Sequence, residues 1–148
     1  MVYELDEKDR KVIEVLKEHS DYATRQIAKK TLLPITTVHH RIKKLKEEGI
    51  IKRFTVELDH VKYGDGLLVY VLISISLPLL KEKKKTQHTV AEEIKRFSFV
   101  ERVDIVSGGT DLVAMIRVTD VAEFDRVLLG KLQLVEGIEK TQSLIVIH

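Results

Sequence analysis

Two hydrophobic periodicities divide the chain near residue 53. Before that residue, apolar side chains recur every three or four positions, which is the period of an amphipathic helix. After it, apolar and polar side chains largely alternate, which is the period of a strand with one covered face. The pattern therefore predicts a helical N-terminal part and a mixed C-terminal part rich in strands.

The N-terminal part is predicted to contain three short helices. The first follows Asp6, an N-cap residue with acidic residues just after it, and runs to about Lys17. The second spans about residues 24–31. The third starts at Pro34, because proline is tolerated in the first turn of a helix and not further inside, and Gly49 closes it.

The third helix has one apolar and one polar side. An apolar stripe at 3–4–3 spacing comprises Ile35, Val38, Ile42 and Leu45. The positions between these residues, and Lys46 after them, are all polar. Such a helix can pack its apolar stripe on the two preceding helices and leave its outer side free to enter the DNA major groove. This is the helix-turn-helix arrangement.

Positive charge is concentrated in the same region. The formal net charge is only +2, but residues 25–53 contain nine Lys or Arg against two Glu, a local charge of +7. A local positive charge of this kind suits binding to the phosphate backbone. Taken alone, a Lys-rich helix side is more often solvated surface, so it is the combination with the helix pattern that favours DNA binding.

The candidate DNA-binding residues follow from this arrangement. One side of the third helix carries Thr36, Thr37, His40 and Lys44, with the threonines near the N-terminus, where base edges are usually met. Basic residues around them are better placed to meet phosphates. Adjacent histidines lie about 100° apart on a helix and cannot share a metal ion as an i, i+4 pair could, so no metal site is predicted. The full predicted set is Arg25, Thr36, Thr37, His39, His40, Arg41, Lys43, Lys44, Lys46, Lys52 and Arg53.

The C-terminal part is predicted to be a ferredoxin-like domain. Residues 54–59 alternate as a strand, and residues 60–66 form a hinge rich in glycine. The elements that follow are a strand over 67–77, a helix over 87–97, strands over 100–107 and 111–118, a helix from Asp120, and a strand over 138–147. The fold class is therefore α+β. A winged-type helix-turn-helix domain (1–53) joins, through a strand and hinge (54–66), a βαββαβ domain (67–148) with both helices on one face of its sheet.

That sheet has more apolar residues than two helices can cover. Leu68, Tyr70 and Leu72 fall on the face opposite Val69 and Val71. The uncovered face should bury itself against another surface. A second copy of the same sheet is the simplest candidate, so the sequence predicts a homodimer.

Composition excludes several other classes of protein. The chain has no cysteine, which excludes disulfides and thiolate metal sites and fits a cytoplasmic protein. The longest apolar stretch is too short to cross a bilayer, and the N-terminus does not have the order of a signal peptide, so no membrane partner is expected. No phosphate-cradling loop and no clustered nucleophile and base are present, so we predict neither catalytic residues nor an enzyme.

Four segments in order resemble the Lrp/AsnC (leucine-responsive, or feast/famine) family of regulators over nearly the whole chain. They are LDEKDRKVIEVLKE, QIAKKTLLPITTVHHRIKKLKEEGIIKRF, SGGTDLVAMIRV and EGIEKTQSLIVI. The family pattern has Leu-Asp-x-x-Asp, then V-x-x-R-I-x-x-L-x-x-x-G-x-I, then G-x-x-D. Here these motifs fall at residues 5–9, 38–51 and 108–111. One departure is Leu32-Leu33-Pro34, where the family has Gly-Leu-Ser before the recognition helix, a change that can tilt that helix.

The resemblance implies a transcription regulator whose C-terminal (RAM) domain forms dimers, often builds tetramers or octamers, and in many members binds an amino acid at subunit interfaces. No other cofactor is implied. Carried over, the effector site comprises Ser107, Gly108, Gly109, Thr110 and Asp111, with Thr141 and Ser143 on the last strand. Glycines can bring backbone N–H groups to a ligand carboxylate, and Asp111 could pair with its ammonium. Alternatively, the two glycines simply form a hairpin turn that Asp111 caps.

The predicted function is a sequence-specific double-stranded DNA-binding regulator that responds to an amino acid or a related small molecule. The alternative is an architectural or chromatin protein that binds DNA with little sequence preference and without an effector. Selection from random DNA distinguishes the two, because only the regulator would enrich a motif.

Overall fold

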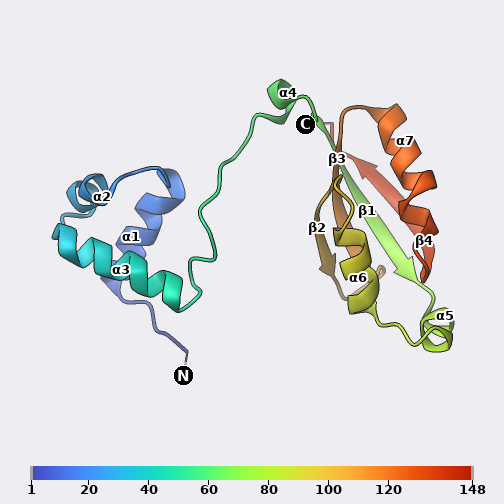
Figure 1. Ribbon diagram of the computed structural model, residues 1–148, viewed down its shortest axis with the longest axis horizontal. Coiled ribbons are helices and arrows are strands. Elements are labelled where there is room, and N and C mark those ends of the chain that lie inside the picture. The colour runs from blue at the N-terminus through green and yellow to red at the C-terminus, as the bar shows by residue number, and fades with distance from the viewer. Residues whose placement is uncertain (1, 148) are drawn as a thin grey trace. The chain divides into compact units, whose positions relative to one another are not determined.

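In the computed structural model, which describes residues 2–147, the chain divides between Glu57 and Leu58 into two compact units (Figure 1). The N-terminal unit contains α1 (Glu7–Glu18), α2 (Thr24–Thr31) and α3 (Ile35–Glu47). The C-terminal unit contains α4 (His60–Tyr63), β1 (Leu67–Ile75), α5 (Leu77–Glu82), α6 (Gln87–Lys95), β2 (Val100–Ile105), β3 (Leu112–Val118), α7 (Val121–Gly130), the 3₁₀ helix η1 (Leu132–Leu134) and β4 (Ile138–Ile145). The predicted α+β architecture is confirmed.

The three N-terminal helices share one small core. Each helix contributes two buried apolar side chains, and the set is Val12, Leu16, Ile27, Ala28, Val38 and Leu45. Packing of this kind holds short helices that would be marginal in isolation. Ile35 was predicted to belong to the stripe, but it is 47% exposed because it is the first residue of α3.

The turn between α2 and α3 is built from unusual residues. Leu32 ends α2 in the left-handed conformation, with φ of 58°, and its side chain is 89% exposed. This conformation costs a non-glycine residue roughly 1–2 kcal/mol. Pro34 is the N-cap of α3 and provides no side-chain hydrogen bond. The position of α3 therefore depends on packing and on its polar contacts with α1.

The C-terminal sheet has the order β2-β3-β1-β4, and all its pairings are antiparallel. Alternate residues of β1, from Val69 to Ile75, are buried on one face. On that face they form one core with Val90 and Ile94 of α6 and Phe124 of α7. Both main helices therefore cover the same face, as predicted.

Two predicted elements are wrong. Residues 54–59 form no strand: residues 52–59 lie outside any helix or strand, and all of them are exposed. The alternation there is real, but a strand needs a partner, and within the described residues none pairs with it. The strand predicted over 67–77 ends at Ile75, because Ser76 and Pro78 start α5, which leaves Leu77 57% exposed.

The face of the sheet opposite the helices, here called the open sheet face, is apolar at its centre. Register places Leu68, Tyr70 and Leu72 of β1 there beside the facing residues of β3 and β4, which include Val113, Met115 and Leu144. Tyr70 is 36% exposed and Leu144 is 47% exposed.

In residues 2–147, no helix combines the length and the apolar character needed to cross a membrane.

Candidate DNA-binding surface and ligand pocket

The outer side of α3 points away from the core of the N-terminal unit. At about 3.6 residues per turn, one stripe of the helix lies opposite Val38 and Leu45. This outer stripe comprises Thr36, His40, Lys43 and Glu47, and all four are exposed. Lys43 Nζ lies 3.8 Å from the Glu47 carboxylate, a weak surface pair that phosphate could replace.

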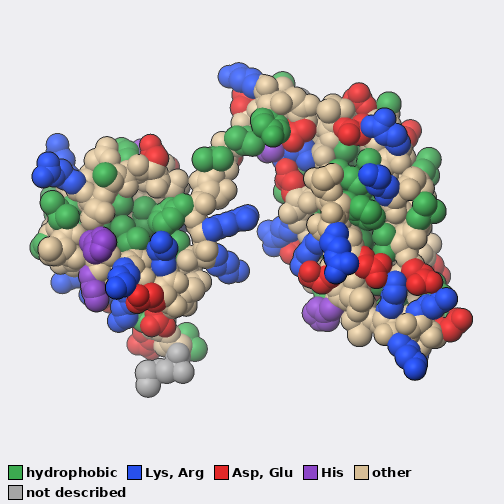
Figure 2. Space-filling view, viewed as in Figure 1, with side chains coloured by type: hydrophobic (Ala, Val, Ile, Leu, Met, Phe, Trp, Pro, Cys, Tyr) green, Lys and Arg blue, Asp and Glu red, His purple; other side chains and the backbone are tan. Residues whose placement is uncertain are grey.

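The other predicted DNA-binding residues flank this stripe. Thr37 and Lys44 are less exposed, and Lys44 Nζ lies 4.6 Å from the centroid of the Tyr3 ring. The remaining predicted residues on the surface are Arg25, His39, Lys46, Lys52 and Arg53. On the face of the N-terminal unit that Figure 2 shows, His side chains lie beside Lys and Arg side chains, and acidic side chains lie next to them. The surface is thus cationic, with polar hydrogen-bonding groups within it.

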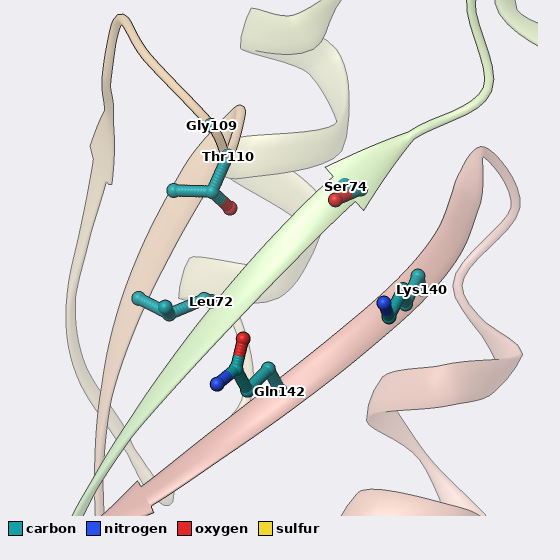
Figure 3. Close-up of a pocket in the computed structure, with 6 residues that line it drawn as sticks. All are labelled: Leu72, Ser74, Gly109, Thr110, Lys140 and Gln142. Carbon is teal, nitrogen blue, oxygen red and sulfur yellow. The ribbon is translucent and has the colours of Figure 1, made fainter.

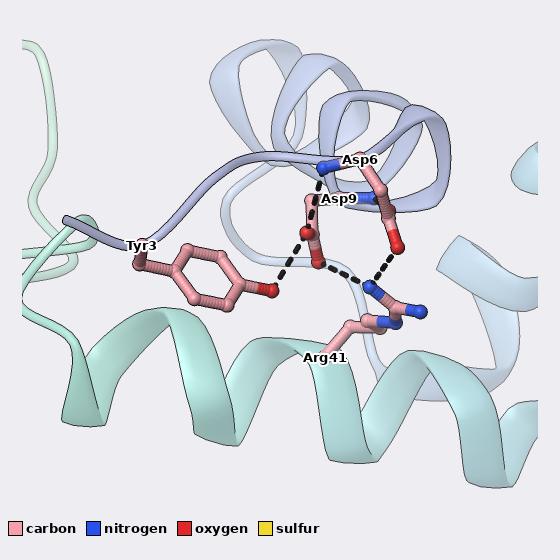
Figure 4. Close-up of polar contacts among 4 residues, drawn as sticks. All are labelled: Tyr3, Asp6, Asp9 and Arg41. Carbon is pink, nitrogen blue, oxygen red and sulfur yellow. Dashed lines mark hydrogen bonds and ion pairs between the residues drawn. The ribbon is translucent and has the colours of Figure 1, made fainter. Parts of the chain in front are cut away.

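Arg41 differs from the other predicted DNA-binding residues, because it points toward the start of α1 (Figure 4). Its Nη1 donates to Oδ1 of Asp9 over 3.1 Å and also to Oδ2 of Asp6. The Arg41 side chain is 22% exposed, and that of Asp9 is fully buried. The prediction that Arg41 faces DNA is therefore corrected, because its guanidinium neutralises a buried carboxylate.

Asp9 is the centre of this cluster, called here the α1–α3 clamp (Tyr3, Asp6, Asp9 and Arg41). It donates its backbone N–H to Asp6 Oδ1 and accepts the Asp6 N–H in return, a reciprocal capping box. The Tyr3 hydroxyl donates to Asp9 Oδ2 over 2.7 Å. Both oxygens of the buried Asp9 carboxylate therefore accept hydrogen bonds, and Arg41, in the middle of α3, connects that helix to the start of α1.

The clamp shifts the pKa values of its members. The Asp9 backbone N–H, and after it Arg41, lower the pKa of Asp6 below its ordinary 3.8. The hydrogen bond to Asp9 raises the pKa of Tyr3, and the two carboxylates, Asp9 first, raise the pKa of Arg41. These directions favour the charged Asp6, the charged Arg41 and the protonated Tyr3 that the clamp requires.

These shifts predict acid sensitivity in the N-terminal unit. Because the folded-state pKa of Asp6 lies below 3.8, its stabilising contribution is fully present above pH 3.8 and is lost as the pH falls through the folded-state value. Urea unfolding between about pH 2.5 and 7 should therefore show a weaker acid dependence for Asp6→Asn than for the unmodified chain. Asp21→Asn, at an exposed position, is the control and should leave the profile unchanged. Equal acid dependence in all three proteins would contradict this role of Asp6.

In the C-terminal unit, the predicted effector turn lies between β2 and β3. Ser107, Gly108 and Gly109 are exposed, and Gly108 has φ of 140°, which favours glycine. Thr110 donates its hydroxyl proton to the Ile73 carbonyl over 2.9 Å. The turn is therefore pinned to the end of β1 and is not a loose loop.

Asp111 is engaged within the chain. Its Oδ2 accepts the Ile75 N–H over 2.8 Å, and its Oδ1 accepts from Gln87 Nε2 over 3.5 Å. The backbone N–H of Asp111 also donates to the Ile73 carbonyl. This arrangement matches the alternative interpretation, in which Asp111 stabilises the turn, and it directs the carboxylate toward α6.

A hollow of about 360 Å³ lies on the open sheet face next to this turn, and we call it the sheet pocket (Figure 3). Its walls come from β1, the turn and β4, and the lining residues are Leu72, Ser74, Gly109, Thr110, Lys140 and Gln142. Two of the predicted effector residues, Gly109 and Thr110, are thus part of a real concavity of a size that suits a small ligand.

Thr141 and Ser143 do not line the sheet pocket. They pair with Ile73 and Val71, so they share the helix-covered face of the sheet. Thr141 Oγ1 accepts from Gln133 Nε2 over 2.8 Å on that side. Their neighbours Lys140 and Gln142 were not among the predicted residues, because both faces of β4 are polar there and alternation alone does not indicate which face is open.

No group of three or more His, Cys, Asp or Glu in residues 2–147 is placed to hold a metal ion. The α1–α3 clamp was also not predicted. Its signal is present in the sequence as Asp6 and Asp9 at N-cap spacing, with a single arginine, Arg41, next to the apolar stripe of the third helix.

Comparison with known proteins covers both units. Residues 5–52 match the model of winged helix-turn-helix DNA-binding domains, and residues 69–148 match that of the Lrp/AsnC ligand-binding domain. An uncharacterized HTH-type transcriptional regulator of Pyrococcus horikoshii is 35% identical over 141 residues, which cover 95% of this chain and 91% of the relative. The HTH-type transcriptional regulator FL11 of Pyrococcus furiosus is 32% identical, with 97% and 89% covered.

Solved structures share the whole fold. A transcriptional regulator of Neisseria meningitidis in complex with L-Met has a TM-score of 0.87 at 23% identity, with 98% of this chain and 91% of the other covered. E. coli AsnC has a TM-score of 0.84 at 21% identity, with 99% and 94% covered. At these identities the likeness establishes the fold.

Proposed function

Because the chain belongs to the Lrp/AsnC family of transcriptional regulators, we propose that it acts as a dimer whose binding to operator DNA responds to an amino acid or a related small molecule. The observation that carries the DNA-binding part is the exposed outer stripe of α3, which lies opposite the fully buried Val38 and Leu45. A helix held in this way can lie in the major groove.

Roles within the surface follow from position. Thr36 and His40 project from the outer stripe, carry hydrogen-bonding groups and are suited to base edges. Lys43, Lys46 and the exposed basic residues Lys52 and Arg53 are suited to phosphates, which position the protein without reading sequence. Glu47 places a carboxylate at the C-terminal end of the same stripe. This carboxylate disfavours contact with a phosphate there, and so it limits the orientations in which α3 can dock on DNA.

The dimer is supported by the open sheet face. Its apolar centre, around Tyr70 and Leu144, is partly exposed in a single chain. A two-fold axis would bring this apolar patch against the same patch of a second copy and remove both from water. Two copies also present two α3 helices, which match the two-fold symmetry usual in operators.

Selection of the full-length protein against random duplex DNA tests this proposal. We expect an enriched motif whose two halves are related by two-fold symmetry. Loss of all enrichment would contradict sequence-specific regulation and favour an architectural DNA-binding protein. A single asymmetric motif would contradict the dimer but not the regulator.

A further inference from the structure

The sheet pocket offers positive charge and hydrogen-bond donors but no acid. None of its six lining residues is Asp or Glu. Lys140 provides an ammonium that forms no ion pair of 4.0 Å or less with any residue in 2–147, and Gln142 provides a side-chain amide. Leu72 provides an apolar wall next to Gln142, with which it pairs in register. In Figure 3, Leu72 and Ser74 on β1 lie between Thr110 on one side and Lys140 and Gln142 of β4 on the other.

The carboxylate nearest in sequence is not available to the pocket. Asp111 follows Thr110 directly, but its two oxygens accept from Ile75 N–H and Gln87 Nε2. Asp111 does not line the pocket, and its contacts with Ile75 and Gln87 hold its carboxylate toward α6. The pocket therefore lacks the anion that an amino-acid ammonium requires.

We propose that the sheet pocket binds a small organic carboxylate that lacks an ammonium group, with a 2-oxo acid as the simplest example. The ligand carboxylate pairs with Lys140, the Gln142 amide donates to a second oxygen, and Leu72 contacts the carbon chain. This inference rests on the proposed function, because it names the chemistry of the effector. An α-ammonium would instead meet Lys140 without a compensating charge, and like charges at close range repel.

The pocket and the proposed dimer surface are neighbours on the open sheet face. Ser74 and Lys140 pair near the end of β1, whereas Tyr70 and Leu144 pair near its middle. The cationic end of the pocket and the apolar centre of the open sheet face therefore adjoin, and Leu72, which pairs with Gln142, belongs to both.

Calorimetric titration of the full-length protein with matched ligand pairs tests the proposal. The pairs are 4-methyl-2-oxopentanoate with L-leucine and pyruvate with L-alanine, each differing in the oxo or amino group alone. We expect at least one oxo acid to bind at least tenfold more tightly than its amino acid. Lys140→Gln should lower that affinity at least tenfold, and Lys81→Gln, at an exposed lysine of α5 outside the pocket, should not change it.

A second variant adds the negative charge that the pocket lining lacks. Gln142→Glu places a carboxylate in the pocket and should shift preference toward the amino acid of each pair. Tighter binding of the amino acids to the unmodified chain, an unchanged affinity in Lys140→Gln, or no binding of any oxo acid would overturn the proposal. Binding of operator DNA is measured in parallel, and if it persists while oxo acids fail to bind, only this inference fails and the regulator proposal stands.

Discussion

Replacement of Asp9 by alanine is expected to lower the free energy of unfolding of the N-terminal unit by about 3 kcal/mol, because it breaks a buried ion pair and leaves Arg41 with the half-exposed Asp6 as its partner. Asp9 is fully buried and contacts Arg41, Tyr3 and the Asp6 backbone at once. The substitution frees the Tyr3 hydroxyl and removes half of the capping box of α1. Hydrogen exchange in urea, read on peptides from α1 and α3, measures the change.

Asp21→Ala is the matched control, since Asp21 is exposed in the same unit and should change unfolding by less than about 0.5 kcal/mol. Because the clamp ties α3 to α1, Asp9→Ala should also weaken DNA binding at temperatures where the unit is still folded. An Asp9→Ala protein with unchanged exchange rates would show that the clamp does not hold the recognition helix.

The double variant Lys43→Ala/Lys46→Ala is expected to bind duplex DNA about 50-fold more weakly at about 0.1 M salt, because each phosphate that the protein no longer neutralises takes about 0.9 from the slope of log affinity against log salt. Both residues are exposed on α3. The slope should therefore fall by about two, and the weakening should be similar for operator and random DNA. Fluorescence anisotropy across a salt series measures affinity and slope together.

Lys11→Ala/Lys17→Ala provides the control for this measurement. It removes the same charge from the same unit, but from α1, where the lysines pair with Glu7 and Glu14. If both double variants weakened DNA binding equally, the net charge of the unit would explain the effect. The lysines of α3 would then contribute no more to DNA affinity than those of α1.

Much of the fold followed from local sequence signals. Pro34 could be placed at the start of α3 because proline is compatible only with the first turn of a helix, and Asp6 could be placed at the start of α1 because its side chain caps. Alternation along β1 revealed which residues face the helices, since the side-chain period of a strand is two. These features depend on neighbours within a few residues.

The features that were missed depend on contacts between distant segments. Arg41 was assigned to DNA because its charge is visible in the sequence, whereas Asp9, 32 residues away, is the partner that turns it inward. Thr141 and Ser143 were placed at the effector site, but the register between β1 and β4 puts them on the other face. The alternation of residues 54–59 predicted a strand, and no local signal reveals whether a strand has a partner.

The connection between the two units sets how far apart two recognition helices can reach in a dimer. Residues 52–59 are exposed and pair with no strand of the described chain. A tether of this length spans at most roughly 26–29 Å, whereas successive major grooves on one side of a duplex are about 34–36 Å apart. Because each subunit contributes its own tether, neighbouring grooves lie within the combined reach, and shortening the tether should restrict the permitted distance between operator halves.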